Sequence, residues 1–296
     1  MPCYTPLIAY RALTGRNPLT GKWPIVFNVK DGYQDMDVSV PCGKCIGCRL
    51  ERSRQWAIRC VHESQLHSEN CFLTLTYSNE NLPENGSLNK RNFVLFMKKL
   101  RKKYGPKIRF FHCGEYGEQF QRPHHHVCLF GYMFKDKKLW KQINDVNLYT
   151  SEELTKLWGY GYCTIGEVTF ESAAYVARYI TKKITGKMAD DHYKGRQPEY
   201  ITMSRKPGIA HDWITKYISD VYPSDQVIIR GKPCKPAKYY DKIYDQTQPE
   251  KFKDLSIQRK IEAKKFAIDN TPERLITKLV CKKQQIKQLK RPYENE

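Results

Sequence analysis

The densest group of chemically capable side chains lies in Arg122-Pro123-His124-His125-His126. The sequence predicts a strand over 124–130, and residues two apart on a strand point to the same face. His124 and His126 therefore project together, and two such imidazoles form half of a site for a divalent metal. Glu115 ends the preceding predicted strand, so a hairpin would bring its carboxylate beside them and leave coordination positions open for a substrate. A polar strand end with solvated histidines is the alternative explanation.

A second group of candidate residues lies within 173–184, where the sequence has helical periodicity. At about 100° per residue, Tyr175, Tyr179 and Lys182 share a narrow arc, opposite an arc of alanine, valine and isoleucine. We expect the apolar arc to pack on the fold and the two phenols to be presented together. A tyrosine oxygen can attack a phosphodiester, while a metal and a nearby ammonium neutralise the developing charge.

The spacing of the two tyrosines is weak evidence when it is taken alone. The chain has 20 tyrosines, so chance supplies roughly one pair at the spacing of helix neighbours. Tyr240 and Tyr244 form a second such pair, in a proline- and lysine-rich stretch without a comparable apolar face. We therefore favour the pair at 175 and 179.

A third pattern is the run of cysteines at 42, 45 and 48. Two overlapping Cys-X-X-Cys steps, Cys42, Cys45 and Cys48, are typical of structural zinc sites. Cys60 and His62 on the following helix both qualify as the fourth ligand. The chain has 11 cysteines and no visible secretory signal, which favours reduced thiols or metal sites over disulfides. A thiol cluster without metal is the alternative.

The charge of the chain indicates its class of partner. Lys and Arg total 51 against 31 Asp and Glu, which gives a formal net charge of +20. Such an excess favours a polyanion, above all nucleic acid, over a role in solubility alone. No apolar run approaches the length of a membrane span, so no membrane partner is expected.

The predicted elements follow a recognisable order between residues 71 and 169. Their sequence is strand, helix, strand, strand, helix, strand, at 71–77, 90–104, 107–113, 124–130, 151–158 and 162–169. This is the order of the ferredoxin-like split βαβ unit. It predicts an α+β fold, an antiparallel sheet with helices packed on one face. A further helix over 172–185 is expected alongside.

The remaining segments give the expected domain organisation. Residues 1–66 form an N-terminal segment with the cysteine cluster, a strand candidate at 23–29 and a helix over 49–66. Residues 67–190 form the core, and 191–296 form a basic C-terminal region. Its last part is helical in character, with a helix start at Thr271-Pro272.

The combination of these motifs resembles the HUH endonuclease superfamily, and most closely the replication initiators of microviruses of the gokushovirus type. The resemblance covers about residues 40–190. It rests on the cysteine segment, Phe72-Leu73-Thr74-Leu75-Thr76-Tyr77, Gly114-Glu115-Tyr116-Gly117, the histidine segment and Tyr175-Val176-Ala177-Arg178-Tyr179. The middle position of the histidine motif is commonly bulky and apolar in that family. Here it is His125, which leaves open a metal geometry that includes this residue.

The resemblance implies a rolling-circle replication initiator. It makes Glu115, His124 and His126 ligands of Mg or Mn, although two imidazoles would also tolerate Zn. It makes Tyr175 and Tyr179 the nucleophiles that cut the origin and rejoin a unit-length circle. The implied partners are the viral DNA origin and the host DNA polymerase and helicase, in the bacterial cytoplasm. The alternative from another class is a non-enzymatic basic protein that binds or packages single-stranded DNA.

Overall fold

The computed structural model describes residues 3–117, 120–143, 146–182 and 188–287, without the side chains at 179–182 and 188. The described residues divide into two compact units, one within 3–51 and 262–287 and one within 52–261. In the described part of the chain, no helix combines the length and the apolar character that crossing a membrane requires.

The described part of the first unit contains a small antiparallel sheet and several helical segments. The sheet has the order β2-β1-β3, with β1 at Leu7–Ala12, β2 at Ile25–Val26 and β3 at Gly32–Val40. Helix α1 (Ile46–Ser64) begins in this unit and continues into the second, and α10 (Pro272–Lys287) belongs to the first. The start of α10 confirms the helix predicted at Thr271-Pro272.

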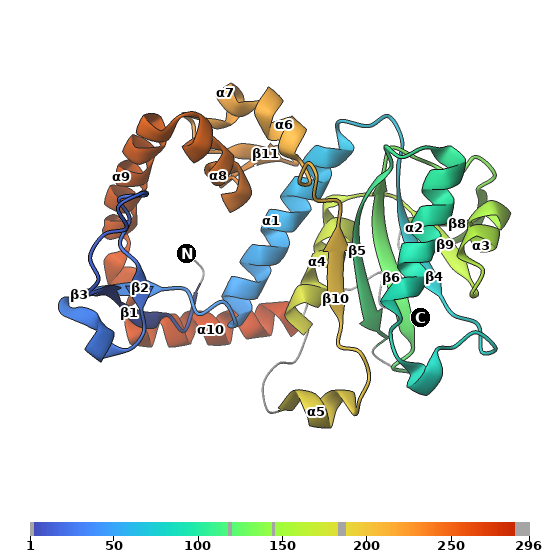
Figure 1. The fold of residues 1–296 in the computed structure, drawn as a ribbon, viewed down its shortest axis with the longest axis horizontal. Coiled ribbons are helices and arrows are strands. Elements are labelled where there is room, and N and C mark those ends of the chain that lie inside the picture. Colours follow the sequence, from blue (N-terminus) through green and yellow to red (C-terminus); the bar gives the residue numbers. More distant parts are fainter. Residues whose placement is uncertain (1–2, 118–119, 144–145, 183–187, 288–296) are drawn as a thin grey trace. The chain divides into compact units, whose positions relative to one another are not determined.

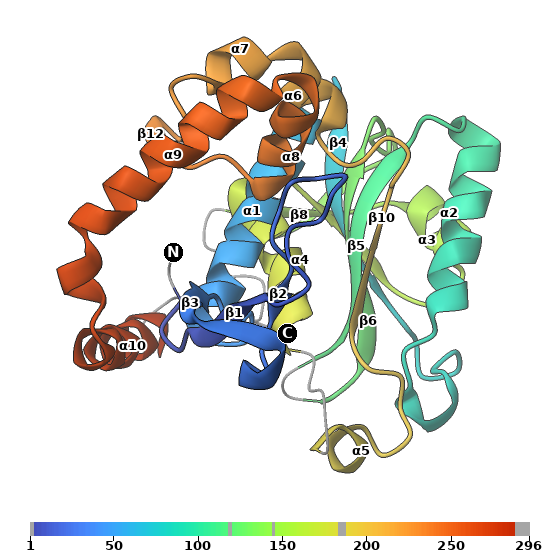
Figure 2. The ribbon, with the colours of Figure 1, turned by 60° about the vertical axis from the view of Figure 1, so that its left-hand side comes forward.

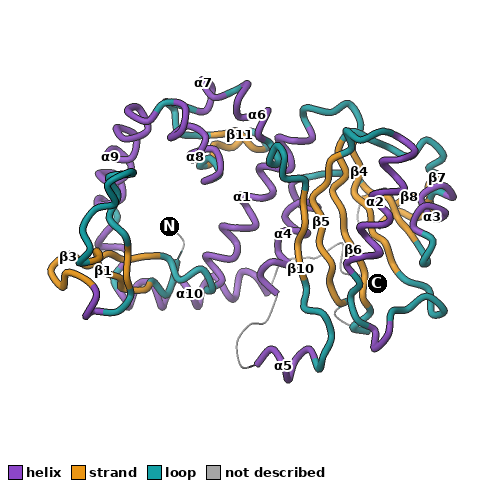
Figure 3. Tube along the Cα trace, in the orientation of Figure 1, coloured by secondary structure: helices purple, strands orange, loops and turns teal. Residues whose placement is uncertain are grey.

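The second unit is built on a seven-stranded antiparallel sheet of order β10-β5-β6-β4-β9-β8-β7 (Figures 1 and 3). The strands are β4 (Asn70–Thr76), β5 (Arg109–Tyr116), β6 (Pro123–Phe130), β7 (Lys138–Ile143), β8 (Val146–Thr150), β9 (Cys163–Gly166) and β10 (Tyr200–Met203). The α+β class and the antiparallel sheet are therefore as predicted, and the sheet extends past residue 190.

Helices cover both faces of this sheet, which corrects the expectation of a single covered face. On one face, α2 (Lys90–Tyr104) and α3 (Glu152–Trp158) pack on Leu73, Leu75 and Leu129. On the other, α4 (Phe170–Lys182) and α1 pack on side chains that include Phe72 and Phe130. Apolar side chains of β4 to β6 point to both faces of the sheet, so other elements must cover both faces.

Local signals in the sequence fix the ends of the two helices on the first face. The Asn89 side chain accepts the N–H of Arg91 at the start of α2, and that of Ser151 accepts the N–H of Leu154 in α3. Gly159 ends α3 with φ of 73°, a left-handed conformation that glycine adopts without strain. The bounds of α2 agree with the predicted helix over 90–104.

The chain after β10 adds a third apolar cluster to the second unit. Its elements are α6 (His211–Lys216), α7 (Ile218–Val221), the hairpin β11 (Val227–Ile229) and β12 (Lys232–Cys234), α8 (Lys238–Thr247) and α9 (Pro249–Lys265). They pack with Ile58 of α1 around a core that includes Ile214, Val221 and Tyr240. The short helix α5 (Met188–Tyr193) precedes β10 (Figure 2), and its Tyr193 belongs to a small buried cluster.

Candidate active site

Two adjacent central strands bring the predicted metal ligands together. Glu115 on β5 pairs in register with His124 on β6, and His126 follows on the same face of β6. Glu115 Oε1 lies 2.7 Å from His124 Nε2 and 2.6 Å from His126 Nε2. The ligand atoms of all three residues lie within 4.8 Å of one another, and all three side chains are buried. The structure thus joins the two histidines that alternation placed on one face with the carboxylate that a hairpin was expected to bring beside them.

Neighbouring groups fix the orientation of both imidazoles. His124 Nδ1 lies 3.0 Å from the Arg122 carbonyl oxygen. A carbonyl only accepts hydrogen bonds, so Nδ1 carries a proton, and Nε2, which faces Glu115, is the nitrogen that would bind a metal. His126 Nδ1 lies 3.0 Å from Thr74 Oγ1, on the strand paired with β6. Such outer contacts hold histidine ligands in the tautomer and orientation that metal binding needs.

The charge balance of this site fits a bound cation. Burial raises the pKa of Glu115, but the adjacent His126 and His124 outweigh it and lower that pKa to about 2. Glu115 is therefore a buried carboxylate, only 1% exposed. Its second oxygen, Oε2, is buried and accepts no hydrogen bond from the described residues. A buried oxygen of this kind and imidazole nitrogens facing one carboxylate suit a divalent metal.

Tyr175 joins this site from α4. Its phenol donates a hydrogen bond to Glu115 Oε1 across 3.2 Å, and its ring meets the His126 ring edge to face with centroids 5.0 Å apart. The side chain is 3% exposed and packs in the core with Ala173, Val176 and Ala177. The helix therefore turns Tyr175 toward the sheet together with its alanines and Val176, which corrects the expectation of an apolar arc opposite the tyrosine.

The side chains of two predicted catalytic residues are not among those that the structure describes. The backbone of α4 runs through Tyr179 and Lys182, but their side chains lie outside the described residues. The expectation that both phenols and the ammonium serve one site stays a prediction.

Comparison with known proteins places the chain in a family. It is 34% identical over 278 residues to replication-associated protein VP4 of Bdellovibrio phage phiMH2K, covering 90% of this chain and 84% of that protein. It is 37% identical over 233 residues to replication-associated protein ORF2 of Spiroplasma virus 4, covering 72% and 70%. The chain belongs to the family of microvirus-type replication initiators.

Two further comparisons mark how the similarity is distributed. This initiator is 33% identical over 215 residues to replication-associated protein ORF4 of Chlamydia phage 1, covering 68% of this chain and 53% of that protein. The family model of the replication-associated protein ORF2/G2P matches residues 70–184. That segment contains Glu115, His124, His126 and the helix of Tyr175. No solved structure matches the chain significantly.

His125 of this initiator belongs to the opposite face of the sheet. Its Nε2 lies 3.1 Å from the Tyr77 hydroxyl and its Nδ1 lies 3.1 Å from His112 Nε2. His112 Nδ1 in turn lies 2.7 Å from Thr202 Oγ1, and Asn92 donates to the Tyr77 oxygen across 3.2 Å. Burial, which is complete for this side chain, lowers the pKa of His125 to about 3. The metal geometry involving His125 is therefore not the one that the structure forms.

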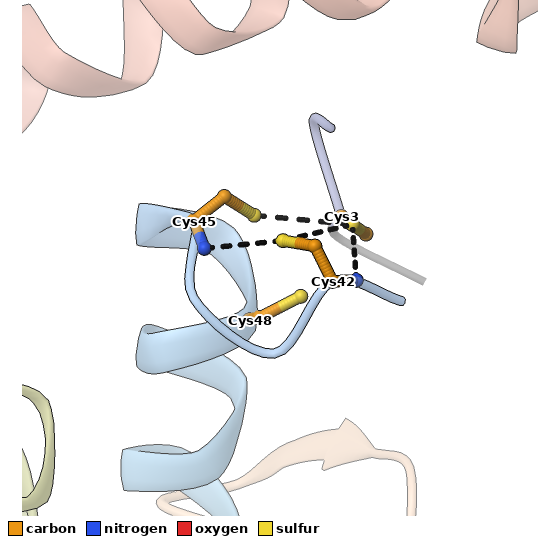
Figure 4. Close-up of side chains that lie close together, drawn as sticks. All are labelled: Cys3, Cys42, Cys45 and Cys48. Atoms are coloured by element: carbon orange, nitrogen blue, oxygen red, sulfur yellow. Dashed lines mark hydrogen bonds between the residues drawn. The ribbon is translucent and has the colours of Figure 1, made fainter. Parts of the chain in front are cut away.

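The cysteine cluster of the initiator lies in the first unit and has a fourth member that the sequence analysis did not name. Cys3 joins Cys42, Cys45 and Cys48, and the four sulfurs lie within 4.8 Å of one another. Figure 4 shows the four side chains converging, with Cys3 arriving from the N-terminal segment. Burial raises the pKa of Cys42, but hydrogen bonds from Thr5 and from the backbone of Cys45 and Lys44 lower it to about 6.

The two residues predicted as the fourth ligand lie in the core of the second unit instead. Cys60 is fully buried with Phe72 and Cys128. His62 stacks on Trp213 with ring centroids 3.5 Å apart, and its Nδ1 lies 2.8 Å from the Tyr240 hydroxyl. Neither expectation for the fourth ligand is therefore met. The hydrogen bond also places Tyr240 in a core, where burial raises its pKa well above the usual range.

Thr74 and Cys3 are the residues that sequence reasoning passed over. A signal for Thr74 existed, because a threonine directly opposite His126 on a neighbouring strand is an available partner for the imidazole. For Cys3, the residue type was the only signal in the sequence, because 38 residues separate it from Cys42 and no spacing rule connects the two.

Proposed function

We propose that this initiator is a site-specific endonuclease and strand transferase of the HUH type. It nicks the origin of a circular single-stranded DNA genome, forms a 5′-phosphotyrosine link and leaves a 3′-hydroxyl that primes synthesis. It then rejoins the displaced strand into a circle. The observation that carries the proposal is the hydrogen bond of the Tyr175 phenol to Glu115 Oε1, the oxygen that both histidines face.

The three residues Glu115, His124 and His126 fit a catalytic metal, for which Mg or Mn is proposed from the family resemblance. Such a cation would polarise the scissile phosphate and offset the charge that develops on it. Three protein ligands leave coordination positions for substrate oxygens, as a catalytic site requires. The chain holds these ligands on paired strands, so their positions are fixed before DNA arrives.

The residues of the chain then carry the transfer itself. Tyr175 Oη attacks the phosphorus, so a phosphotyrosyl bond forms as the bond from phosphorus to the 3′ oxygen breaks. The phenol loses one proton and the leaving 3′ oxygen gains one, so the exchange is balanced. Because the phosphodiester energy is kept in the new bond, a free 3′-hydroxyl can later attack the link and release the tyrosine. Tyr179 is proposed as the second nucleophile, which permits a second cut while the first tyrosine is occupied.

The connectivity of the sheet supports the same proposal. Strands β4, β5, β6 and β9, with helices α2 and α3, follow the order strand, helix, strand, strand, helix, strand. They lie in the sheet as β5-β6-β4-β9, which is the arrangement of a split βαβ unit. We include in the proposal that viral origin DNA is the substrate. Host polymerase and helicase would be the partners, in the bacterial cytoplasm.

Nicking of a supercoiled plasmid that carries the cognate viral origin tests this function. With Mg or Mn, the protein should produce open circles that carry protein through denaturing detergent. The His124→Ala/His126→Ala variant should lose nicking and keep DNA binding. Trypsin cuts after Arg178, so Tyr175 and Tyr179 fall in different peptides, 157–178 and 179–182. Mass spectrometry of the DNA-linked peptide therefore identifies the nucleophile.

Tyrosine variants complete the test. Tyr175→Phe and Tyr179→Phe should each keep one route to cleavage and lose efficient circle release, whereas the double variant should form no adduct. Tyr162→Phe is the matched control, because Tyr162 shares the first peptide but is 73% exposed and outside the site. An adduct on Tyr240 or Tyr244 would contradict the proposal. Gel retardation without nicking would favour the non-enzymatic binding protein.

A further inference from the structure

The four sulfurs of Cys3, Cys42, Cys45 and Cys48 have the spacing of a tetrahedral metal site. Cys3 Sγ lies 3.7 Å from Cys42 Sγ and 3.9 Å from Cys45 Sγ. Four thiolates around zinc at about 2.3 Å stand about 3.8 Å apart from one another. A disulfide requires sulfurs about 2 Å apart, and all four cysteines are free. The arrangement is thus too open for a disulfide and matches the edges of a zinc tetrahedron.

Backbone and side-chain donors already point at these sulfurs. The N–H groups of Cys42 and Cys45 donate to Cys3 Sγ and Cys42 Sγ across 3.3 and 3.2 Å. The N–H of Tyr4 donates to Cys45 Sγ across 3.4 Å, and the Thr5 hydroxyl donates to Cys42 Sγ across 3.2 Å. Donors of this kind offset the negative charge that thiolate ligands bring. The start of α1 at Ile46 adds the positive end of a helix dipole beside Cys45.

The local chain is shaped to close around the cluster. Gly43 has φ of 72°, a left-handed conformation that allows the tight turn between Cys42 and Cys45. Cys48 then projects from the first turn of α1. Cys3 precedes β1 and Cys42 follows β3, whose ends pair at Leu7 and Val40. A metal here would fasten the start of β1 and the end of β3, which lie at one end of the small sheet, to the first turn of the helix.

In its described residues, the first unit also buries few of the apolar side chains that could hold it without such a fastening. Among the described residues before α1, the buried hydrophobic side chains are Cys3, Ala9 and Ala12. Larger apolar side chains of the segment are exposed, namely Leu7, Ile8, Leu13, Leu19, Ile25, Phe27 and Val29. Small units with so little buried area are commonly held by a metal or by disulfides.

We propose that Cys3, Cys42, Cys45 and Cys48 bind one structural zinc ion, separate from the catalytic metal. Zinc is the occupant because four thiolates form a soft, closed site, whereas Mg and Mn prefer oxygen ligands. Each thiol loses its proton to solvent as the metal binds, so no oxidant or reductant is involved. The two sites sort their metals by ligand chemistry: sulfur in the first unit, and carboxylate with imidazole in the second.

Elemental analysis of the purified full-length protein tests this site. After dialysis against EDTA, the protein should keep about one zinc per chain, and so should the His124→Ala/His126→Ala variant. Cys42→Ser/Cys45→Ser and Cys3→Ser should lose the retained zinc, whereas Cys3→His should restore it because imidazole also binds zinc. Cys60→Ser is the matched control, since it removes the cysteine of α1 that lies in the core, and it should keep zinc.

Reconstitution covers the case in which a cysteine variant does not fold. Wild-type protein stripped of zinc under reducing conditions should take up about one equivalent of Co²⁺ and develop the strong visible bands of a tetrahedral thiolate site. Adding zinc back should displace the cobalt and remove those bands. Zinc unaffected by Cys3→Ser, iron in place of zinc, or cobalt spectra without thiolate bands would each overturn the proposal. None of these outcomes depends on nicking, so failure of the proposed function is seen separately.

Discussion

At the scale of single residues, the three proposed metal ligands meet on one face of the sheet because a period of two leaves little freedom in a paired strand. Glu115 and His124 face each other in register, as a hairpin of adjacent strands requires. The arc assigned to Tyr175 was less accurate. Helical arithmetic assumes one covered side, whereas α4 buries Tyr175 and Val176 alike. Cys3 could not be assigned at all, since only the folded chain brings it to Cys42.

Thr74 provides a residue-scale prediction. Because its hydroxyl lies 3.0 Å from His126 Nδ1, Thr74→Val should leave that imidazole poorly oriented and weaken metal binding about 10- to 100-fold. Isothermal titration with Mn²⁺ measures the change. The control is Thr202→Val, which removes an equivalent contact with His112 on the other face of the sheet. If the wild type and Thr74→Val bind Mn²⁺ with equal affinity, Thr74 does not help to hold the site.

At the scale of elements, long helices and alternating strands were predictable, whereas short edge strands were not. The helix α2 and strands β4 and β6 carry strong periodic patterns, and they form within one residue of the expected bounds. The hairpin β7–β8 and strand β10 were missed. Their residues are largely exposed or half-buried, so no apolar alternation marks them, and only pairing with the sheet makes them strands.

A buried ion pair between elements gives the second prediction. Glu63 of α1 is paired with Arg109 of β5 and accepts the N–H of Ala210. Burial raises the pKa of Glu63, but His67, Ala210 and Arg109 outweigh it, so the folded-state pKa lies below 4.5. The pair therefore stabilises the fold above about pH 4.5, and this contribution disappears as the pH falls through the folded-state pKa.

Glu63→Gln should lower the free energy of unfolding by about 3 kcal/mol at neutral pH, because it leaves Arg109 without its buried partner. Urea denaturation followed by circular dichroism measures the change, and the gap to wild type should narrow in acid. Glu171→Gln breaks an exposed pair with Arg230 and should cost less than about 1 kcal/mol. A cost for Glu63→Gln no larger than that of the control would refute the role of this pair.

At the scale of the whole molecule, the net charge of +20 indicated the partner but could not indicate the architecture. The first unit combines described residues within 3–51 and 262–287, two segments at opposite ends of the sequence. No local pattern joins them, because composition and periodicity act over short windows. The antiparallel core, in contrast, is contiguous in sequence, and its class was therefore predictable.

The charge predicts a steep dependence of DNA binding on salt. If the protein neutralises at least six phosphates, its affinity for duplex DNA should fall about 1,000-fold or more between 50 and 200 mM salt. Fluorescence anisotropy with labelled DNA measures this slope. The Tyr175→Phe/Tyr179→Phe variant has the same charge and should show the same slope while forming no adduct. A flat salt dependence would mean that the basic residues do not contact the DNA.

The chain of hydrogen bonds on the opposite face of the sheet from the proposed metal site has a consequence for the evolution of the family. Asn92, Tyr77, His125, His112 and Thr202 pass one donor to the next acceptor across the interior. Replacing His125 alone with an apolar residue would leave the Tyr77 hydroxyl proton and a nitrogen of His112 buried without the hydrogen bonds that His125 makes with them. A substitution of His125 is therefore tolerated only when its hydrogen-bond partners change as well. Relatives with an apolar residue between the two histidines proposed to bind metal should carry compensating residues at the positions of Tyr77 and His112, so that the three positions evolve as a single unit.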